Sequence, residues 1–211
     1  MLHRPDVVDG AVELLDAEGL DGITMRKLGA ALNVQAGALY RHFESKEALL
    51  DAIAERLLAG VGDDIPEGPW PDQLLAIANR LRGALLAHRD GARVVSGTYV
   101  NGTNTLTAGQ VAVEILGDAG LPAEQAGWLT FAMFYYVLGH TIEEQAQARL
   151  PPGDTWRNRL SRTETSLSPS FTTALDSVAD ADPGERFAYG MRVFLNGIAH
   201  ELTPDRGARE R

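Results

Sequence analysis

The chain has 211 residues and a mass of 22.7 kDa, which suits one domain of ordinary size or a small domain joined to a larger one. Hydrophobic residues make up 45% and charged residues 23%, values that exclude global disorder. Because the chain has no cysteine, disulfides, thiolate zinc sites and cysteine nucleophiles are excluded. No apolar run is long enough to span a membrane, and Asp6, Asp9 and Glu13 interrupt any signal peptide, so we expect a soluble cytoplasmic protein.

Positive charge gathers in one window of an otherwise acidic chain. The net charge of −10 argues against a non-specific nucleic-acid coat. Between residues 24 and 46, however, one acid, Glu44, accompanies four basic side chains, which are Arg26, Lys27, Arg41 and Lys46. Charge alone does not distinguish a binding surface from a chance fluctuation, so the fold of this window decides between them.

Apolar residues recur at spacings of three and four, which predicts an all-α protein. We expect the first four helices at about residues 5–18, 25–32, 35–42 and 46–59. Gly19 is suited to end the first helix, and Thr24 and Ser45 are suited to cap the second and the fourth. The first three helices would then form an N-terminal head.

The rest of the chain predicts a larger helical body. Helices are expected at about residues 74–87, 92–96, 108–115, from 123 onward as the longest, near 171–178 and at 183–202, with a turn at 97–104 and a long mobile loop at 150–170. The longest helix carries an apolar row at heptad-like spacing, formed by Trp128, Phe131, Tyr135, Leu138 and Ile142. This helix and the last one, at 183–202, lie either in a monomeric core or, from two copies of the chain, in a four-helix bundle. We expect the bundle, and therefore a homodimer.

The window from residue 24 to residue 46 predicts a helix-turn-helix unit, whose second helix enters the major groove of DNA. The leading end of that helix, residues 36–38, reads Ala-Gly-Ala and is thin enough for the backbone to approach base edges. Thr24 and Lys46 stand at helix N-termini, where backbone amides also favour phosphate. The predicted DNA contacts are Thr24, Arg26, Lys27, Gln35, Ala36, Gly37, Ala38, Tyr40, Arg41, His42 and Lys46.

Three segments of this window resemble a known family. They are GITMRKL at residues 22–28, GALYRHF at 37–43 and KEALL at 46–50, and they are similar to the DNA-binding head of the TetR (tetracycline-repressor) family of transcriptional regulators. Residues 84–94 and 138–145 are also similar to the body of the tetracycline-repressor subfamily. The resemblance implies an all-helical homodimer with two DNA-binding heads and a small-molecule pocket in each half of the body.

The resemblance also indicates how the ligand differs from magnesium-tetracycline. The metal-binding histidine of that subfamily falls on Val95, and valine cannot ligate. A polar amide and a phenyl ring fall on Ile77 and Leu81, and an arginine falls on Tyr99, which makes the pocket drier and more aromatic. We therefore expect an apolar or aromatic effector and no cofactor. The predicted ligand contacts are Ile77, Leu81, Val95, Thr98, Tyr99, Asn104, Trp128, Phe131, Tyr135 and Glu143.

These inferences divide the chain into a helix-turn-helix domain (1–48), a connecting helix (49–65), a ligand-binding and dimerisation domain (66–204) and a tail (205–211). The expected function is that of a transcriptional repressor, which binds a palindromic operator as a homodimer and is released by the effector. The alternative is a helix-turn-helix regulator that has no small-molecule effector and is controlled by a protein partner.

Other readings of the sequence have less support. An enzyme is not expected, because the chain has no G-x-S-x-G motif and its five histidines are scattered. His140 with Glu143 or Glu144 could bind a metal, but ordinary hydrogen bonds at a polar helix end are the simpler interpretation. His88 is expected at a contact between head and body rather than at a ligand.

Overall fold

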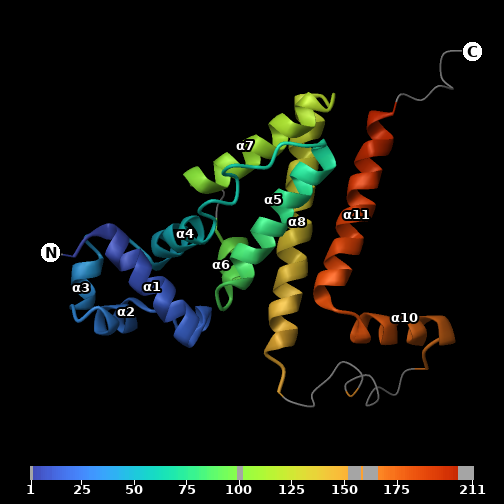
Figure 1. Ribbon diagram of the computed structural model, residues 1–211. Helices are drawn as coiled ribbons and strands as arrows, with labels where there is room; N and C mark the ends of the chain where they lie inside the picture. The colour runs from blue at the N-terminus through green and yellow to red at the C-terminus, as the bar shows by residue number, and fades with distance from the viewer. Residues whose placement is uncertain (1, 99–101, 152–157, 159–165, 204–211) are drawn as a thin grey trace, which may run out of the picture. The chain divides into compact units, whose positions relative to one another are not determined.

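The computed structural model describes residues 2–98, 102–151, 158 and 166–203, and every regular element within them is a helix, as predicted (Figure 1). The chain forms two compact units, residues 1–145 and 146–211. The helices of the first unit are α1 (Arg4–Glu18), the 3-10 helix η1 (Leu20–Gly22), α2 (Met25–Ala31), α3 (Ala36–Leu39), α4 (Lys46–Leu57), α5 (Trp70–Leu86), α6 (Gly91–Ser96), α7 (Thr103–Asp118) and α8 (Ala123–Ala148), whose last turn crosses into the second unit.

The head consists of α1, α2 and α3, which enclose a small apolar core. Val7, Leu15, Leu28 and Leu39 are fully buried there, at the spacings that predicted the helices. The two predicted caps are confirmed. The Thr24 hydroxyl accepts a hydrogen bond from the Lys27 amide at 3.2 Å. In the same way the Ser45 hydroxyl accepts from the Ala48 amide at 3.1 Å at the start of α4.

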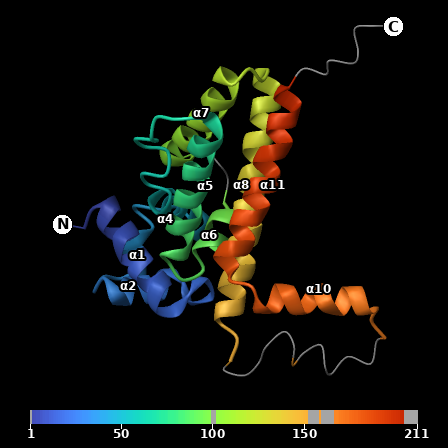
Figure 2. The same ribbon diagram turned by 45° about the vertical axis from the view of Figure 1, so that its right-hand side comes forward.

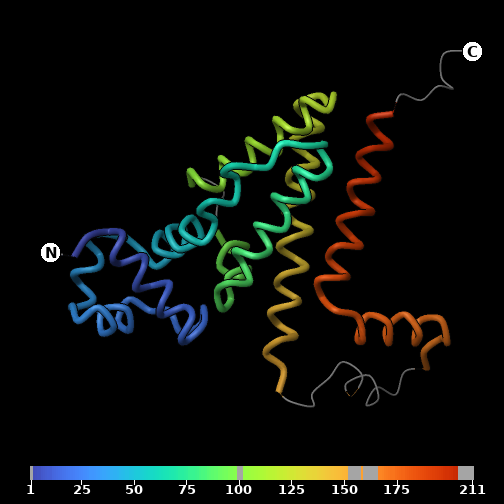
Figure 3. The backbone as a smooth tube through the Cα atoms, in the orientation of Figure 1, coloured from blue at the N-terminus to red at the C-terminus, as the bar shows by residue number. Residues whose placement is uncertain are grey.

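Helix α4 connects the head to the body. It packs against α1 on one side and against α6 and α7 on the other, so it touches both parts of the first unit. The chain then runs alongside α7 to reach α5 (Figure 3). Gly62 permits this close approach, because a Cβ there would lie 2.7 Å from Ala108 Cα. Helix α5 packs against α6 and α7, and these helices with α8 form the body (Figure 2).

Several helix boundaries differ from the sequence-based expectation, among them the start of α5, which lies at Trp70 rather than near residue 74. Helix α3 covers only Ala36–Leu39 instead of 35–42, because Tyr40 to His42 continue as turns. Helix α7 begins at Thr103 rather than near residue 108, because Glu55 of α4 accepts hydrogen bonds from its first amides. The helix predicted near 171–178 extends over Pro169–Asp180, because Ser168 caps it at Phe171.

The second unit contains α10 (Pro169–Asp180) and α11 (Pro183–Leu202). Asp182 caps α11 through the amides of Gly184 and Glu185. One face of α11 is buried at Phe187 and Met191, whereas Tyr189 on another face is exposed. No helix in the described part of the chain is long and apolar enough to cross a membrane.

Candidate DNA-binding face and ligand pocket

The turn between α2 and α3 is tight and depends on two residues. Asn33 adopts a left-handed conformation (φ 54°), which asparagine tolerates better than most residues. Gly29 is packed directly against the turn, since a Cβ there would lie 2.9 Å from the Val34 carbonyl oxygen and 3.1 Å from the Ala36 nitrogen. The Val34 amide donates to the Gly29 carbonyl at 2.8 Å. The turn therefore fixes α3 relative to α2.

Most of the predicted DNA contacts lie on the surface of the head. The exposed ones are Thr24, Arg26, Lys27, Gln35, Gly37, Tyr40 and Arg41, and the partly exposed ones are Ala36, Ala38, His42 and Lys46. Gly37 has open space before it, because a Cβ at this position would meet no protein atom within 4 Å. The protein's own packing therefore does not require a glycine at this position, and here α3 presents no side chain to its surroundings.

Two cations beside this face have partners within the head. Lys27 forms an ion pair with Glu18, and both side chains are partly exposed. The guanidinium of Arg4 stacks 4.5 Å from the ring centroid of Phe43, just beyond α3. Sequence reasoning missed Arg4 as a positive group next to the face, because the contact joins the start of α1 to the end of the helix-turn-helix unit.

A first junction between head and body is the turn at residues 88–92, with the sequence HRDGA. His88 Nδ1 lies 2.9 Å from Asp16 Oδ2 of α1, which confirms the predicted contact of His88 with the head. The Arg89 amide donates to the other oxygen of Asp16 at 3.0 Å. The buried carboxylate of Asp90 accepts from the Leu20 amide at 3.0 Å. Asp90 itself has a left-handed backbone (φ 59°).

The side chain of Gln145, on α8, holds the same turn from the body. Its amide nitrogen donates to the carbonyl oxygens of Leu85 at 2.9 Å and His88 at 2.8 Å. Its amide oxygen accepts from the Ala92 amide at 3.3 Å. One buried side chain thus satisfies backbone groups at the end of α5 and the start of α6.

A second junction joins α4 to the first turn of α7. The carboxylate of Glu55 accepts hydrogen bonds from the amides of Asn104 and Thr105, and at 3.4 Å from the Thr105 hydroxyl. The Asn104 side-chain nitrogen donates to the Glu55 carbonyl at 2.9 Å. A carboxylate at a helix N-terminus satisfies free amides and complements the helix dipole. The connecting helix is therefore attached to α7.

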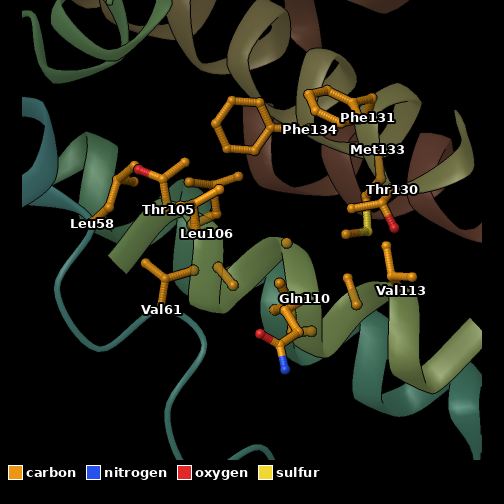
Figure 4. A pocket seen from close by; sticks show the side chains of 15 residues that line it. Leu58, Val61, Thr105, Leu106, Gln110, Val113, Thr130, Phe131, Met133 and Phe134 are labelled. Atoms are coloured by element: carbon orange, nitrogen blue, oxygen red, sulfur yellow. The ribbon is translucent and has the colours of Figure 1, made fainter. Parts of the chain in front are cut away.

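A cavity of about 430 Å³ lies beside this second junction (Figure 4). Its walls come from the end of α4, the segment after it, and α5, α7 and α8. The lining residues are Leu58, Val61, Ile77, Leu81, Thr105, Leu106, Ala108, Gly109, Gln110, Ala112, Val113, Thr130, Phe131, Met133 and Phe134. None of these described side chains is charged, and such a lining suits a small apolar molecule.

The cavity includes only part of the predicted ligand set. Ile77, Leu81 and Phe131 line it. Asn104 lies outside, because its side chain is bonded to Glu55, and the Thr98 hydroxyl is bonded to the Val95 carbonyl. The others outside the lining are Val95, which is buried elsewhere, and Trp128, Tyr135 and Glu143, which are exposed on α8. Tyr99 lies outside the described residues.

The lining residues that sequence reasoning missed come mainly from α7, and the others come from α8 and from the segment that follows α4. On α7, Leu106, Gly109 or Gln110, and Val113 recur at three- and four-residue spacing, which is a signal for one helix face. Nothing in the sequence indicates that this face borders a cavity rather than a filled core. Leu58 and Val61 likewise read as ordinary core residues of the connecting segment.

The apolar row on α8 is divided in the structure. Trp128 is 67% exposed and Tyr135 64% exposed, whereas Leu138 is buried. The outer part of this row is therefore not core of the first unit. At the other end of α8, Arg82 donates to both oxygens of Glu144, at 3.0 and 2.6 Å, and His140 Nδ1 lies 3.7 Å from Glu144. Among the described residues, no group of three histidines and carboxylates could hold a metal ion.

Comparison with known proteins gives matches to both parts of the chain. Residues 7–53 match the family described as bacterial regulatory proteins, tetR family, and residues 63–202 match the tetracyclin repressor-like, C-terminal domain. The chain is 37% identical over 203 residues to the tetracycline repressor protein class A from transposon 1721 of Escherichia coli, and the match covers 94% of this chain and 91% of that protein. These relatives are regulatory proteins rather than enzymes.

Two solved structures are similar over nearly the whole chain. ActR of Streptomyces coelicolor, in complex with actinorhodin, is 26% identical with a TM-score of 0.82, and the match covers 96% of this chain and 99% of that one. BioQ with its double-stranded DNA operator is 28% identical with a TM-score of 0.71, and the match covers 95% and 99%. Proteins of this fold and similar sequence have thus been observed with a small molecule and with DNA.

Proposed function

This chain belongs to the TetR family of bacterial regulatory proteins and is not an enzyme, and we propose that it is a transcriptional repressor that binds a palindromic operator as a homodimer and releases it when an apolar or aromatic molecule enters the body. The observation that carries this proposal is the attachment of α4 to α7 through Glu55, directly beside the apolar cavity. We propose the cytoplasm as its location, because the operator DNA that it would bind lies in the cytoplasm of a bacterial cell.

The head supplies the DNA-binding half of the proposal. Its exposed donors and cations lie around a helix whose leading end is open at Gly37. We propose that the side chains at Gln35, Tyr40 and Arg41 read base edges, and that Thr24 and Lys46 hold phosphates at helix N-termini. The BioQ complex with its operator supports this use of the fold.

The homodimer is proposed from apolar side chains that each unit leaves in solvent. On α8 these are Trp128, Phe131 and Tyr135, and on α11 they are Tyr189 and Val193. Large apolar side chains grouped on a helix face indicate an interaction surface, and a second copy of the chain would cover them. Two heads joined in this way would contact half-sites about one helical turn apart.

We propose that the effector acts through both junctions. A molecule that displaces α7 would pull on Glu55 and hence on α4, whose other side packs on α1 of the head. The turn at residues 88–92 would transmit movement of α6 to Asp16 of α1. A hundredfold loss of operator affinity needs about 2.7 kcal/mol of coupling, which is within the range of a few such hydrogen bonds.

We keep the sequence-based division of the chain as part of this proposal, with residues 1–48 for DNA binding, 49–65 for connection, 66–204 for ligand binding and dimerisation, and 205–211 as a tail. In the ligand set we retain Ile77, Leu81 and Phe131, which line the cavity, and we add Leu106 and Thr130 of its walls.

The direct test is operator selection followed by release. Random duplexes selected on the purified protein should converge on a palindrome, and analytical ultracentrifugation should show two chains per duplex. Arg41→Ala and Tyr40→Ala should weaken operator binding by about tenfold or more without lowering thermal stability, since both side chains are exposed. Arg80→Ala, in the body, is the matched control. Failure of both head variants to affect binding would contradict the proposal.

Release is tested separately with a panel of aromatic molecules, with and without magnesium. The proposal expects release that does not depend on magnesium, because Val95 stands where the tetracycline-repressor subfamily has its metal-binding histidine. Release by magnesium-tetracycline alone would contradict the proposed effector class. If the protein binds its operator and no aromatic molecule releases it, control by a protein partner becomes the better hypothesis.

A further inference from the structure

Thr130 is a buried polar residue without a partner in the wall of the cavity. It lies on α8 and is 8% exposed, and its hydroxyl oxygen makes no hydrogen bond. Figure 4 shows this oxygen turned toward Val113 of α7, so it lies where α7 and α8 meet along the cavity. Most buried hydroxyls in proteins have a partner, and each exception calls for an explanation.

The same helix shows the usual solution. Thr141 is also buried on α8, and its hydroxyl donates to the Val137 carbonyl one turn earlier at 2.7 Å. A threonine in a helix can normally make this bond to its own backbone. Thr130 does not, although its helical environment permits it. The Thr130 hydroxyl oxygen has almost no accessible surface where it lies against α7, but a rotation about the Cα–Cβ bond turns it to the cavity that the residue lines, where a bound molecule would supply the missing partner.

The other polar groups of the described lining are already engaged. The Thr105 hydroxyl lies 3.4 Å from Glu55 Oε2, and the exposed Gln110 donates to Glu114 Oε1 at 2.7 Å. Since no charged side chain is among the described lining residues, a buried charge on the ligand would be uncompensated. The remaining surface is aliphatic or aromatic.

Resting on the proposed function, we infer that the effector is an uncharged, largely apolar molecule with one hydrogen-bonding oxygen, a carbonyl, ether or hydroxyl, at the end that lies between α7 and α8, where the Thr130 hydroxyl donates to it. This bond satisfies the one described lining hydroxyl that lacks a partner. It also selects among apolar molecules of similar shape, which the apolar walls of the cavity alone cannot do.

The test uses three probes of nearly equal shape: benzophenone, which has a carbonyl acceptor; diphenylmethane, which has none; and diphenylacetate, which is charged. Binding is measured by equilibrium dialysis on the intact protein without DNA. We expect benzophenone to bind roughly three- to tenfold more tightly than diphenylmethane, the contribution of one neutral hydrogen bond. Diphenylacetate should bind at least about a hundredfold more weakly than benzophenone.

Variants assign the preference to one atom. Thr130→Val should abolish the preference for benzophenone and leave diphenylmethane binding unchanged, while Thr130→Ser should keep it. Thr141→Val, which removes a satisfied hydroxyl outside the cavity, should also keep the preference. Circular dichroism melts show whether each variant is folded. If a variant does not fold, the comparison of the three probes on the wild-type protein still tests the inference.

The inference is overturned if benzophenone does not bind, if diphenylacetate binds as tightly as benzophenone, or if Thr130→Val weakens both neutral probes equally. These measurements do not involve DNA. A protein that shows the expected selectivity but has no operator would contradict the proposed function alone. A protein that releases its operator to charged aromatic molecules would contradict only the inference.

Discussion

The carboxylate of Glu55 lies at the N-terminus of α7, where it accepts a hydrogen bond from the Asn104 amide. The side-chain nitrogen of Asn104 in turn donates a hydrogen bond to the Glu55 backbone carbonyl at 2.9 Å. This reciprocal pair joins the connecting helix to a wall of the cavity. The two residues are 49 positions apart in the chain, so the connection exists only in the folded protein. It links a wall of the cavity to the connecting helix, which packs against α1 of the head.

Glu55→Ala should therefore separate ligand binding from DNA release. We expect the variant to lose about 1–3 kcal/mol of stability, because the amides of α7 lose a charged acceptor, and to bind ligand with little change while releasing less operator DNA. Urea unfolding, equilibrium dialysis and fluorescence anisotropy of labelled operator measure the three quantities. Glu67→Ala is the control, since this glutamate is exposed and lies outside both junctions. Unchanged release in Glu55→Ala would contradict the proposed route.

Two glycines of the head should respond in opposite ways to alanine. Gly29→Ala forces a Cβ against backbone atoms of the turn and should destabilise the protein by about 1–3 kcal/mol. Gly37→Ala meets no protein atom and should leave stability unchanged or raise it by up to about 1 kcal/mol. Thermal melts measure both effects. Because the added methyl group would stand between α3 and DNA, Gly37→Ala should weaken operator binding about tenfold, and full affinity would show that α3 does not approach the duplex closely.

Lys46 should act on DNA through phosphate rather than through bases. Lys46→Ala should weaken operator and random duplexes by the same factor and reduce the salt dependence of log K by about one ion per half-site. Titrations at several salt concentrations measure this slope. Lys27→Ala is the comparison, because the Lys27 ammonium is already paired with Glu18 and should change the slope less. A loss confined to one base position would assign Lys46 a reading role instead.

Glu47 should contribute a pH-dependent part of the stability. Its pKa is lowered from the ordinary value of 4.5 because its own backbone amide, and then the Ser45 hydroxyl, donate to the carboxylate. Since the folded pKa lies below the unfolded one, the contribution is present above pH 4.5 and is lost as the pH falls through the folded pKa. In urea unfolding, Glu47→Gln should therefore be less stable than the wild type at neutral pH and should approach it in acid. Glu44→Gln is the control, and a constant difference at all pH values would contradict the assignment.

The head could be predicted from the sequence because its signals are local. Thr24 and Ser45 each cap a helix three residues before the amide they bind, so the pattern is visible along the chain. The fully buried Leu28 and Leu39 lie on the faces that the helical periodicity requires. The end of α3 was the exception, because a four-residue helix is too short for periodicity to define.

The cavity could be predicted only in part, because it depends on how distant helices cross. Ile77 and Leu81 were identified through a resemblance and Phe131 through the aromatic row of the longest helix, whereas Thr130 and Leu106 were not identified. An apolar residue at helical spacing reads the same whether it faces a filled core or an empty space. The same ambiguity applies to Trp128, because its place in the apolar row of α8 does not reveal that its side chain is exposed to solvent.

Gln145 has a consequence for how the body can move. Shifting the turn at residues 88–92 without α8 would break the three hydrogen bonds that this side chain makes to Leu85, His88 and Ala92, at about 0.5–1.5 kcal/mol each. The turn and α8 therefore behave as one rigid piece. Because α8 also carries the exposed rings of Trp128 and Tyr135, in the proposed homodimer a displacement of the turn in one subunit would reach the surface that contacts the second subunit.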